Sequence, residues 1–175
     1  MKLFFALWPD DAPRREMGRW AAALHRLCTG RRTPTDNLHI TLAFLGQVEP
    51  ARLETIVAAA RSVQPRQFTL RMDQPGYWKH NNIAWLGASE APQELNAMVG
   101  DLRAALAQAG LVFDPKPFVP HVTMVRNARE PREEWPTLLP VEWPVNGFAL
   151  VSSERDESGP YYRMAAEPFQ ASTAA

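Results

Sequence analysis

Two copies of a His-x-Thr-x pattern constrain the fold of this chain more than any other feature. They read HITL at residues 39–42 and HVTM at residues 121–124. Both alternate as a strand does, so that histidine and threonine share one face while apolar residues occupy the other. The two histidines are 82 positions apart (121 − 39), close to half of the 175 residues. This spacing predicts two strands that face each other across a groove.

The elements around the two motifs also repeat. Before each motif the pattern predicts a strand, a capped helix and a basic or proline-rich loop. The distance from strand to histidine agrees, at 34 residues from Phe5 to His39 and 36 residues from Trp85 to His121. We therefore expect a bilobal α+β fold with approximate two-fold symmetry, in which antiparallel sheets line a central groove and helices lie outside.

We expect one domain over residues 1–175, with approximate half-repeats at 1–80 and 81–169 and a frayed tail at 170–175. Apolar periodicity and turn residues set the individual elements. The expected helices cover 11–29, 51–63 and 89–109, with a helical turn at 133–135; the expected strands cover 2–8, 67–72, 77–79, 83–87, 145–152 and 161–167; loops are expected at 31–36 and 127–144, and a break at 75–76.

The overall charge limits the kind of partner. The 19 basic residues balance 19 acidic ones, whereas a protein that coats nucleic acid carries a basic excess. If the protein binds RNA, we expect it to bind an end or a few nucleotides. Arginine outnumbers lysine by 16 to three, and its planar guanidinium suits phosphate, although codon usage alone also produces such a bias.

The sequence gives no sign of export or of a membrane span. The apolar run at residues 3–8 stops at Pro9, which is too short for a secretion signal, and no apolar segment approaches the roughly 18 residues of a spanning helix. A single cysteine, Cys28, excludes an internal disulfide. We expect a cytoplasmic protein, and because nothing suggests an obligate oligomer, a monomer.

Paired histidines and threonines suit the opening of a phosphodiester. One group must take a proton from the attacking water or hydroxyl, another must give a proton to the departing oxygen, and the two oxygens lie roughly in line across phosphorus. Histidine has a reference pKa of about 6.5, so His39 and His121 can share these tasks near neutrality. The hydroxyls of Thr41 and Thr123 can donate to a non-bridging phosphate oxygen. Symmetry alone leaves open which histidine is the acid.

Other chemistries find less support. A metal site would need three or four convergent ligands, and the chain has no His-x-His, no His-Glu-x-x-His and one cysteine. Gly-x-Ser-x-Gly, a P-loop and the Lys-x-Asp-Gly of ATP-dependent ligases are also missing. We expect no metal site. His25 and His80 have no partner in the repeat, so we expect them to be structural or solvated.

Residues beside the motifs could contact substrate. Arg126 follows the second motif and could bind phosphate or base, and Phe44 follows the first and could stack on a base. Strict alternation, however, puts Arg126 on the face opposite His121 unless the strand bulges, and puts Phe44 in the core with Ile40. The last strand, through residues 161–163, could also reach the groove.

These residues resemble the two-histidine phosphoesterases, in particular the bacterial RNA 2′,3′-cyclic phosphodiesterases, also called 2′-5′ RNA ligases. The resemblance covers nearly the whole chain and includes LFFAL at 3–7, DNLHITLAFLG at 36–46 and PFVPHVTMVR at 117–126. It implies the bilobal fold of that superfamily. It also implies hydrolysis of a 2′,3′-cyclic phosphate at an RNA or nucleotide end, which leaves a 2′-phosphate.

The resemblance further implies roles for single residues. His39 would be the proton donor and His121 the proton acceptor. Thr41 and Thr123 would hold the phosphate, and no metal or nucleotide cofactor would be needed. Weak, reversible 2′-5′ joining of RNA ends would be the same chemistry with a 5′ hydroxyl replacing water. Two alternatives stay open: end joining, chiefly of tRNA halves, as the main role, and a nucleotide- or RNA-end-binding module without turnover.

Overall fold

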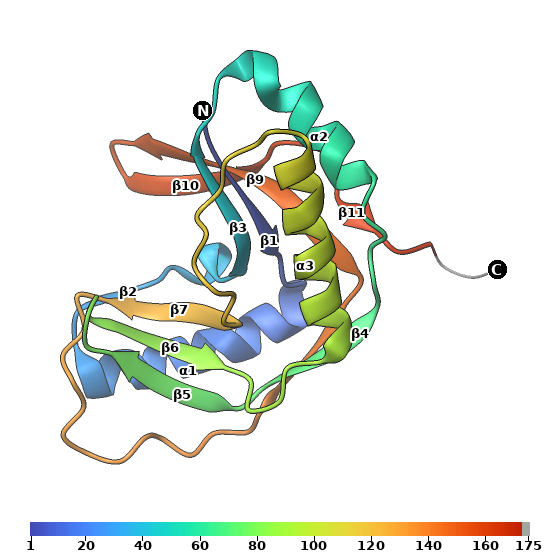
Figure 1. Ribbon diagram of the computed structural model, residues 1–175. Helices are drawn as coiled ribbons and strands as arrows, with labels where there is room; N and C mark the ends of the chain where they lie inside the picture. Colours follow the sequence, from blue (N-terminus) through green and yellow to red (C-terminus); the bar gives the residue numbers. More distant parts are fainter. Residues whose placement is uncertain (173–175) are drawn as a thin grey trace.

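Two antiparallel sheets form the framework of the molecule, with helices packed against them (Figure 1). The computed structural model describes residues 1–172. Its helical segments are α1 (Asp11–Cys28), η1 (Thr35–Asn37), η2 (Pro50–Arg52), α2 (Leu53–Arg61) and α3 (Gln93–Gln108). Its strands are β1 (Lys2–Leu7), β2 (Arg31–Arg32), β3 (Ile40–Gln47), β4 (Phe68–Met72), β5 (Gln74–Trp78), β6 (Ile83–Gly87), β7 (His121–Arg126), β8 (Val141–Val145), β9 (Gly147–Asp156), β10 (Gly159–Met164) and β11 (Phe169–Gln170).

The two motif strands lie in different sheets. The first sheet has the strand order β10-β9-β1-β3, and β11 also pairs with β9. Its strand β1 is buried from Leu3 to Leu7, because it is paired on both edges, and this burial explains the unbroken apolar run there. The second sheet has the order β2-β7-β6-β5, while β4 and β8 form a separate pair.

The chain crosses between the two lobes. The first sheet combines β1 and β3 from the start of the chain with β9 and β10 from its end. Helix α1, which follows β1, packs against β6 and β7 of the second sheet, whereas α3, which follows β6, packs against β3 of the first (Figure 1). The bilobal fold with antiparallel sheets is confirmed. The half-repeats 1–80 and 81–169, however, do not coincide with the two lobes.

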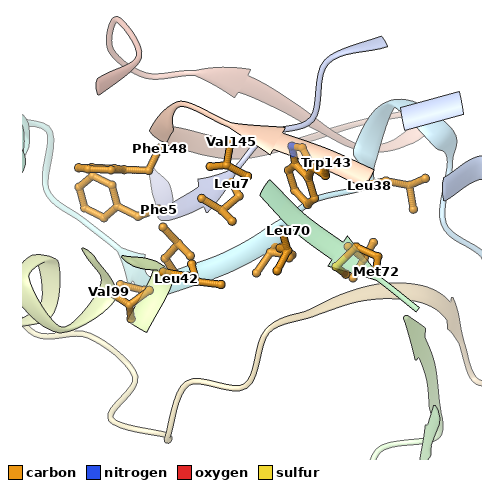
Figure 2. Packing of buried hydrophobic residues seen from close by; sticks show 14 of the residues in the cluster. Phe5, Leu7, Leu38, Leu42, Leu70, Met72, Val99, Trp143, Val145 and Phe148 are labelled. Atoms are coloured by element: carbon orange, nitrogen blue, oxygen red, sulfur yellow. The ribbon is translucent and has the colours of Figure 1, made fainter. Parts of the chain in front are cut away.

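The main core joins the first sheet to α3 and to the β4–β8 pair (Figure 2). Within it, Phe5 meets Phe148 edge to face, with the ring centroids 5.9 Å apart. Under the second sheet, α1 buries Met17, Trp20 and Leu24 at three- and four-residue spacing, as its periodicity predicted. Each such buried side chain stabilises the fold by about 1.5–3 kcal/mol.

The segment before the C-terminal strands differs from the expectation. The strand predicted over 145–152 is β9, which continues to Asp156, whereas β8 falls almost entirely in the predicted loop at 127–144, and residues 133–135 form no helical turn. Strand β8 contains Pro144, which the sequence reading took for an interruption. Because β8 pairs with β4 alone, a proline is tolerated on its free edge. Gly147 follows the turn with φ of 131° and lies so close to Phe169 that a Cβ would be 1.9 Å from its carbonyl oxygen.

Two further strands differ from the expectation. Residues 31–32, predicted as loop, form β2 and pair with β7. Strand β5 runs through the predicted break at Pro75 and Gly76, because an edge strand accepts proline. Gly76 makes room for a tryptophan on the neighbouring strand: a Cβ at this position would lie 2.0 Å from the Trp85 ring.

Helix and chain ends also differ in detail. Helix α3 begins at Gln93 and not at 89, because the Ser89 backbone N–H and hydroxyl both donate to Asp73, at 2.8 and 2.7 Å. The predicted frayed tail at 170–175 is wrong at its start, since Gln170 belongs to β11 and the Ala171 N–H donates to the Asn146 carbonyl. Residues 173–175 of that tail lie outside the described residues.

Candidate active site

A cleft of about 940 Å³ lies between the two sheets, and both motifs open into it. His39 and Thr41 reach it from the first sheet, and His121 and Thr123 reach it from the second. Arg126 and Phe44 line it as well. All six residues that the sequence singled out therefore lie around one cavity, although the two motifs that carry them are 82 positions apart in the chain.

The two histidines are held in the same way. The Nδ1 atom of His39 lies 2.6 Å from the Asn37 carbonyl oxygen, and the Nδ1 atom of His121 lies 2.8 Å from the Val119 carbonyl oxygen. A carbonyl can only accept, so each Nδ1–H donates to the residue two positions earlier. This hydrogen bond fixes the ring and leaves Nε2 as the nitrogen free for chemistry. In His39, Nε2 lies 3.2 Å from the Thr41 hydroxyl, which donates to it while the ring is neutral.

Both motif strands bulge at the same place. In the pairing of β1 with β3, Ala6 faces Thr41 and Phe5 faces Ala43, so the residue between them is extra. In the pairing of β6 with β7, Trp85 faces Thr123 and Ala84 faces Val125, again with one extra residue between them. These extra residues, Leu42 and Met124, both stand three positions after the histidine. A bulge reverses the alternation of all residues that follow it.

The bulges bring Phe44 and Arg126 to the cleft. The side chain that alternation assigned to the core, Phe44, is 38% exposed and lines the cavity. Arg126 lies on the histidine face, as expected only for a bulged strand. The expectation from strict alternation was therefore wrong at both positions. A sequence signal was available, since two consecutive apolar residues follow the threonine in each motif, as Leu42-Ala43 and Met124-Val125.

Each bulge is fixed through its carbonyl oxygen. Arg103 on α3 donates to the Leu42 carbonyl from Nε at 3.2 Å and from Nη2 at 3.0 Å, and its Nη1 donates to the Lys116 carbonyl at 2.7 Å. The Met124 carbonyl accepts instead from the backbone N–H of Thr33, at 2.9 Å. Sequence reasoning missed Arg103, because no motif surrounds it and its role depends on the packing of α3 against β3, which is distant in the sequence.

Aromatic rings enclose the two histidines unequally. Three rings surround His39: Trp8 stacks on it at 5.3 Å between centroids, Phe4 lies at 5.0 Å, and Tyr162 meets it edge-on at 5.3 Å. A single ring, that of Trp78, meets His121 edge-on at 4.5 Å. Among residues 161–163, Tyr162 thus reaches the cleft. No motif or spacing in the sequence pointed to Trp8 or Trp78 as site residues.

Burial governs the charge of both rings. Burial is the main cause that lowers the pKa of His39 to about 4. The hydrogen bond to Asn37 opposes it, and the positive charges of Arg126, His121 and Arg14 act in the same direction as burial. Burial and then Arg126 also lower the pKa of His121, against the hydrogen bond to Val119. Both rings are therefore neutral near pH 7 in the unliganded protein. A bound anion favours protonation, because it offsets the nearby positive charge.

The cleft is strongly basic although the chain is neutral overall. Six cationic side chains line it, namely Arg31, Arg32, Arg103, Lys116, Arg126 and Arg155, against one carboxylate, Asp114. This concentration suits a polyanionic ligand. The two remaining histidines differ from each other: His25 lies near the end of α1, with Nε2 3.0 Å from the Gly30 carbonyl, whereas His80 lines the cleft beside Trp78.

Two structural features are absent from residues 1–172. No group of three or more His, Cys, Asp or Glu side chains in this part of the chain is arranged to hold a metal ion. No helix within the same range is long and apolar enough to cross a membrane.

Comparison with known proteins places this chain in a family. The model of the 2′-5′ RNA ligase superfamily matches residues 9–157. The chain is 32% identical over 152 residues to an RNA 2′,3′-cyclic phosphodiesterase of Escherichia coli, covering 87% of this chain and 86% of that protein. It is 30% identical over 172 residues to an RNA 2′,3′-cyclic phosphodiesterase of Thermus thermophilus, covering 93% and 86%.

A solved structure shares the fold. The crystal structure of Escherichia coli LigT complexed with 3′-AMP superposes with a TM-score of 0.84 at 29% identity, and the match covers 98% of both chains. That protein therefore binds a nucleotide carrying a phosphate on its ribose, on a fold that matches this chain almost throughout.

Proposed function

The chain belongs to the 2′-5′ RNA ligase superfamily, and we propose that it hydrolyses RNA or nucleotide 2′,3′-cyclic phosphate ends to 2′-phosphates. One observation carries the proposal: two histidines from opposite sheets, each anchored through Nδ1 to the carbonyl two residues earlier, present Nε2 to one basic cleft. Two such rings supply an acid and a base on opposite sides of a phosphorus atom, which an in-line displacement requires.

In this mechanism, side chains of the protein carry out both proton transfers and no cofactor takes part. His121 takes a proton from water through Nε2 while the water oxygen bonds to phosphorus. The bond from phosphorus to the ribose 3′ oxygen breaks, and protonated His39 gives its Nε2 proton to that oxygen. The product carries a free 3′ hydroxyl and a 2′-phosphate. This assignment of acid and base follows the resemblance to the family, because the two anchoring hydrogen bonds are alike.

The acid must be charged before it can act. In the free protein the pKa of His39 is about 4, so near pH 7 the ring is neutral and its Nε2 carries no proton. The anionic phosphate stabilises the protonated ring when it binds and thereby raises this pKa. Substrate binding and protonation of His39 are therefore coupled. Without substrate, the Nε2 atom of His39 has no proton to donate.

The threonines and their neighbours complete the site. Thr41 and Thr123 share a strand face with the histidines and donate to the non-bridging phosphate oxygens, where negative charge grows. Arg126 adds a guanidinium on the same side, and Phe44 offers a ring on which a base can stack. His39 would lose its hydrogen bond from Thr41 once it is protonated, which frees that hydroxyl for the phosphate.

End joining is the second candidate, and the family description supports it. In this reaction a 5′ hydroxyl replaces water as the nucleophile that His121 activates, and the ring-opened product is a 2′-5′ link. The chemistry is reversible and uses the same residues. We further propose that the protein acts as a monomer in the cytoplasm, since both motifs come from one chain and its single cysteine is buried and unpaired.

A product analysis tests the function. The purified protein is incubated with a short RNA that ends in a 2′,3′-cyclic phosphate, with EDTA present, and the product phosphate is located by phosphorus NMR. We expect a 2′-phosphate at a rate that EDTA does not change. A strict requirement for added metal would contradict the mechanism. Joining of matched RNA ends that outpaces hydrolysis would favour the second candidate, and measurable affinity without turnover would favour a binding module.

A further inference from the structure

Three arginines form a continuous row on one wall of the cleft. Arg126 ends β7, and Arg31 on β2 is its cross-strand partner, so their Cα atoms lie about 5 Å apart. Arg32 follows Arg31 on β2 and pairs with Val125, and all three arginine residues line the cleft. Arg126 acts electrostatically on both histidines, which places one end of the row beside the proposed reaction centre.

The row is free to bind an anion. Within residues 1–172 none of its three guanidinium groups lies within 4.0 Å of a carboxylate. Two other cations of the cleft are already engaged: Arg103 donates to two carbonyl oxygens, and Lys116 lies 3.5 Å from Asp114. The segment over residues 29–34 that carries Arg31 and Arg32 contains no acidic residue.

The opposite lobe offers a less favourable exit for a polyanion. The β9–β10 hairpin also lines the cleft and contributes Arg155, but Glu154, Asp156 and Glu157 surround that arginine in sequence. These three carboxylates offset the positive charge of Arg155, although they do not line the cleft themselves. Figure 1 shows β2 and the hairpin on opposite lobes, so the two exits are separate.

We infer that Arg31 and Arg32 bind the phosphates upstream of the terminal nucleotide, so that the preferred substrate is an RNA chain and not a mononucleotide. The terminal phosphate occupies the histidine pair, and the rest of an RNA lies on its 5′ side. The chain then leaves the cleft along β2, where each further phosphate meets an unpaired guanidinium. This inference rests on the function proposed above, because that function sets which end of the RNA lies between the histidines.

The test compares two substrates in three proteins. A hexanucleotide ending in a 2′,3′-cyclic phosphate and a 2′,3′-cyclic mononucleotide are hydrolysed by the wild type, by Arg31→Gln/Arg32→Gln and by Arg15→Gln/Arg19→Gln. The last variant is the matched control, because it removes two exposed arginines of α1 that do not line the cleft. The readout is the ratio of kcat/KM for the hexanucleotide to that for the mononucleotide, measured at several salt concentrations.

We expect Arg31→Gln/Arg32→Gln to lower this ratio by about tenfold, while the control keeps the wild-type ratio. Since each phosphate contact on a single strand adds about 0.7 to the slope of log affinity against log salt, the slope for the hexanucleotide should fall by about 1.4. An unchanged ratio, or an equal loss in the control, would overturn the inference while leaving the proposed function intact. A fourth protein, Arg155→Gln, is assayed in the same way, and a larger loss in this variant would also overturn the inference, because the RNA would then leave along the hairpin.

A binding measurement separates this inference from the proposed function. Fluorescence anisotropy with a labelled hexanucleotide ending in a 2′-phosphate reports affinity without turnover. If the wild type hydrolyses neither substrate, the proposed function fails, and the anisotropy data alone decide whether Arg31 and Arg32 hold RNA. We expect about tenfold weaker binding by Arg31→Gln/Arg32→Gln than by the control, and equal binding by the two variants would contradict the inference.

Discussion

Phe44 and Arg126 occupy equivalent positions in the two halves of the cleft. Each stands five residues after its histidine, and in each strand an extra residue three positions after the histidine turns the side chain into the cleft. The same backbone device therefore delivers an aromatic ring from one sheet and a guanidinium from the other. The symmetry of the backbone is kept, but the chemistry of the two sides differs, as a substrate with a base at one end and phosphates at the other requires.

The equivalence predicts different kinetic effects for the two residues. Arg126→Gln removes a cation beside both histidines and should lower kcat on a 2′,3′-cyclic substrate by about 10²–10³, the usual cost of removing a group that stabilises developing charge. Steady-state kinetics measure this, with Arg129→Gln as the control, because Arg129 follows the same strand but does not line the cleft. Equal kcat values for Arg126→Gln and wild type would contradict the role.

Phe44→Ala should act on binding. Stacking of a base on an aromatic ring contributes about 1–3 kcal/mol, so KM should rise by about tenfold or more while kcat changes little. Phe44→Tyr keeps the ring and should keep the wild-type KM. If instead Phe44→Ala lowers kcat and leaves KM unchanged, the ring does not hold the base.

Arg103→Gln should weaken the bulge that turns Phe44 into the cleft. The guanidinium joins the Leu42 and Lys116 carbonyls, and leaving such groups without a partner costs about 1–3 kcal/mol. For a chain of this size the Tm should fall by about 2–4 °C for each kcal/mol lost. Calorimetry measures the stability, and the KM of Arg103→Gln shows whether Phe44 has moved: a lowered Tm with wild-type KM would mean that Arg103 stabilises the fold without positioning the ring.

The buried histidines predict a loss of stability in mild acid. The pKa of His39 is about 4 in the folded protein and about 6.5 in the unfolded chain, so as the pH falls through 6.5 the unfolded chain takes up the proton first. The free energy of unfolding should not depend on this group above pH 6.5, and it should fall by about 2 kcal/mol between pH 7 and pH 5. Below pH 4 this contribution stays constant.

Urea unfolding at the two pH values measures that loss. His39→Asn should lose less stability than the wild type between pH 7 and pH 5. Because His121 also has a lowered pKa, some acid sensitivity should persist in His39→Asn. The same pH dependence in wild type and His39→Asn would show that the ring is not held neutral by its burial.

The sequence predicted the motif strands well because their signals are local. Alternation and apolar spacing located β1, β3, β6, β7 and the helices, although the predicted side-chain caps at the starts of α1 and α3 do not form. The repeat of His-x-Thr-x with its preceding strand and helix predicted two lobes around a groove. The residues that carry chemistry were also visible, because a spacing of two puts His39 and Thr41 on one strand face without knowledge of any partner strand.

The remaining features depend on contacts between distant segments. Strict alternation misplaced Phe44, since a bulge is defined by the neighbouring strand and not by the strand's own residues. Pro144 concealed β8, because only its position on a two-stranded edge makes the proline acceptable. Trp8 and Trp78 gave no signal, as their packing on the histidines depends on the final arrangement of the sheets. The crossing of α1 and α3 between lobes was equally hidden from local pattern.

Catalysis in the proposed mechanism depends on both histidines of the cleft, and variants of the two rings test this dependence. His39→Ala, His121→Ala and the control His25→Ala are assayed beside the wild type on an RNA ending in a 2′,3′-cyclic phosphate, with EDTA present and with folding checked by circular dichroism. We predict that each cleft variant loses on the order of a hundredfold or more in kcat, as expected for general acid–base groups, while His25→Ala keeps wild-type activity. Full activity in either folded cleft variant would show that the two histidines are not the catalytic pair.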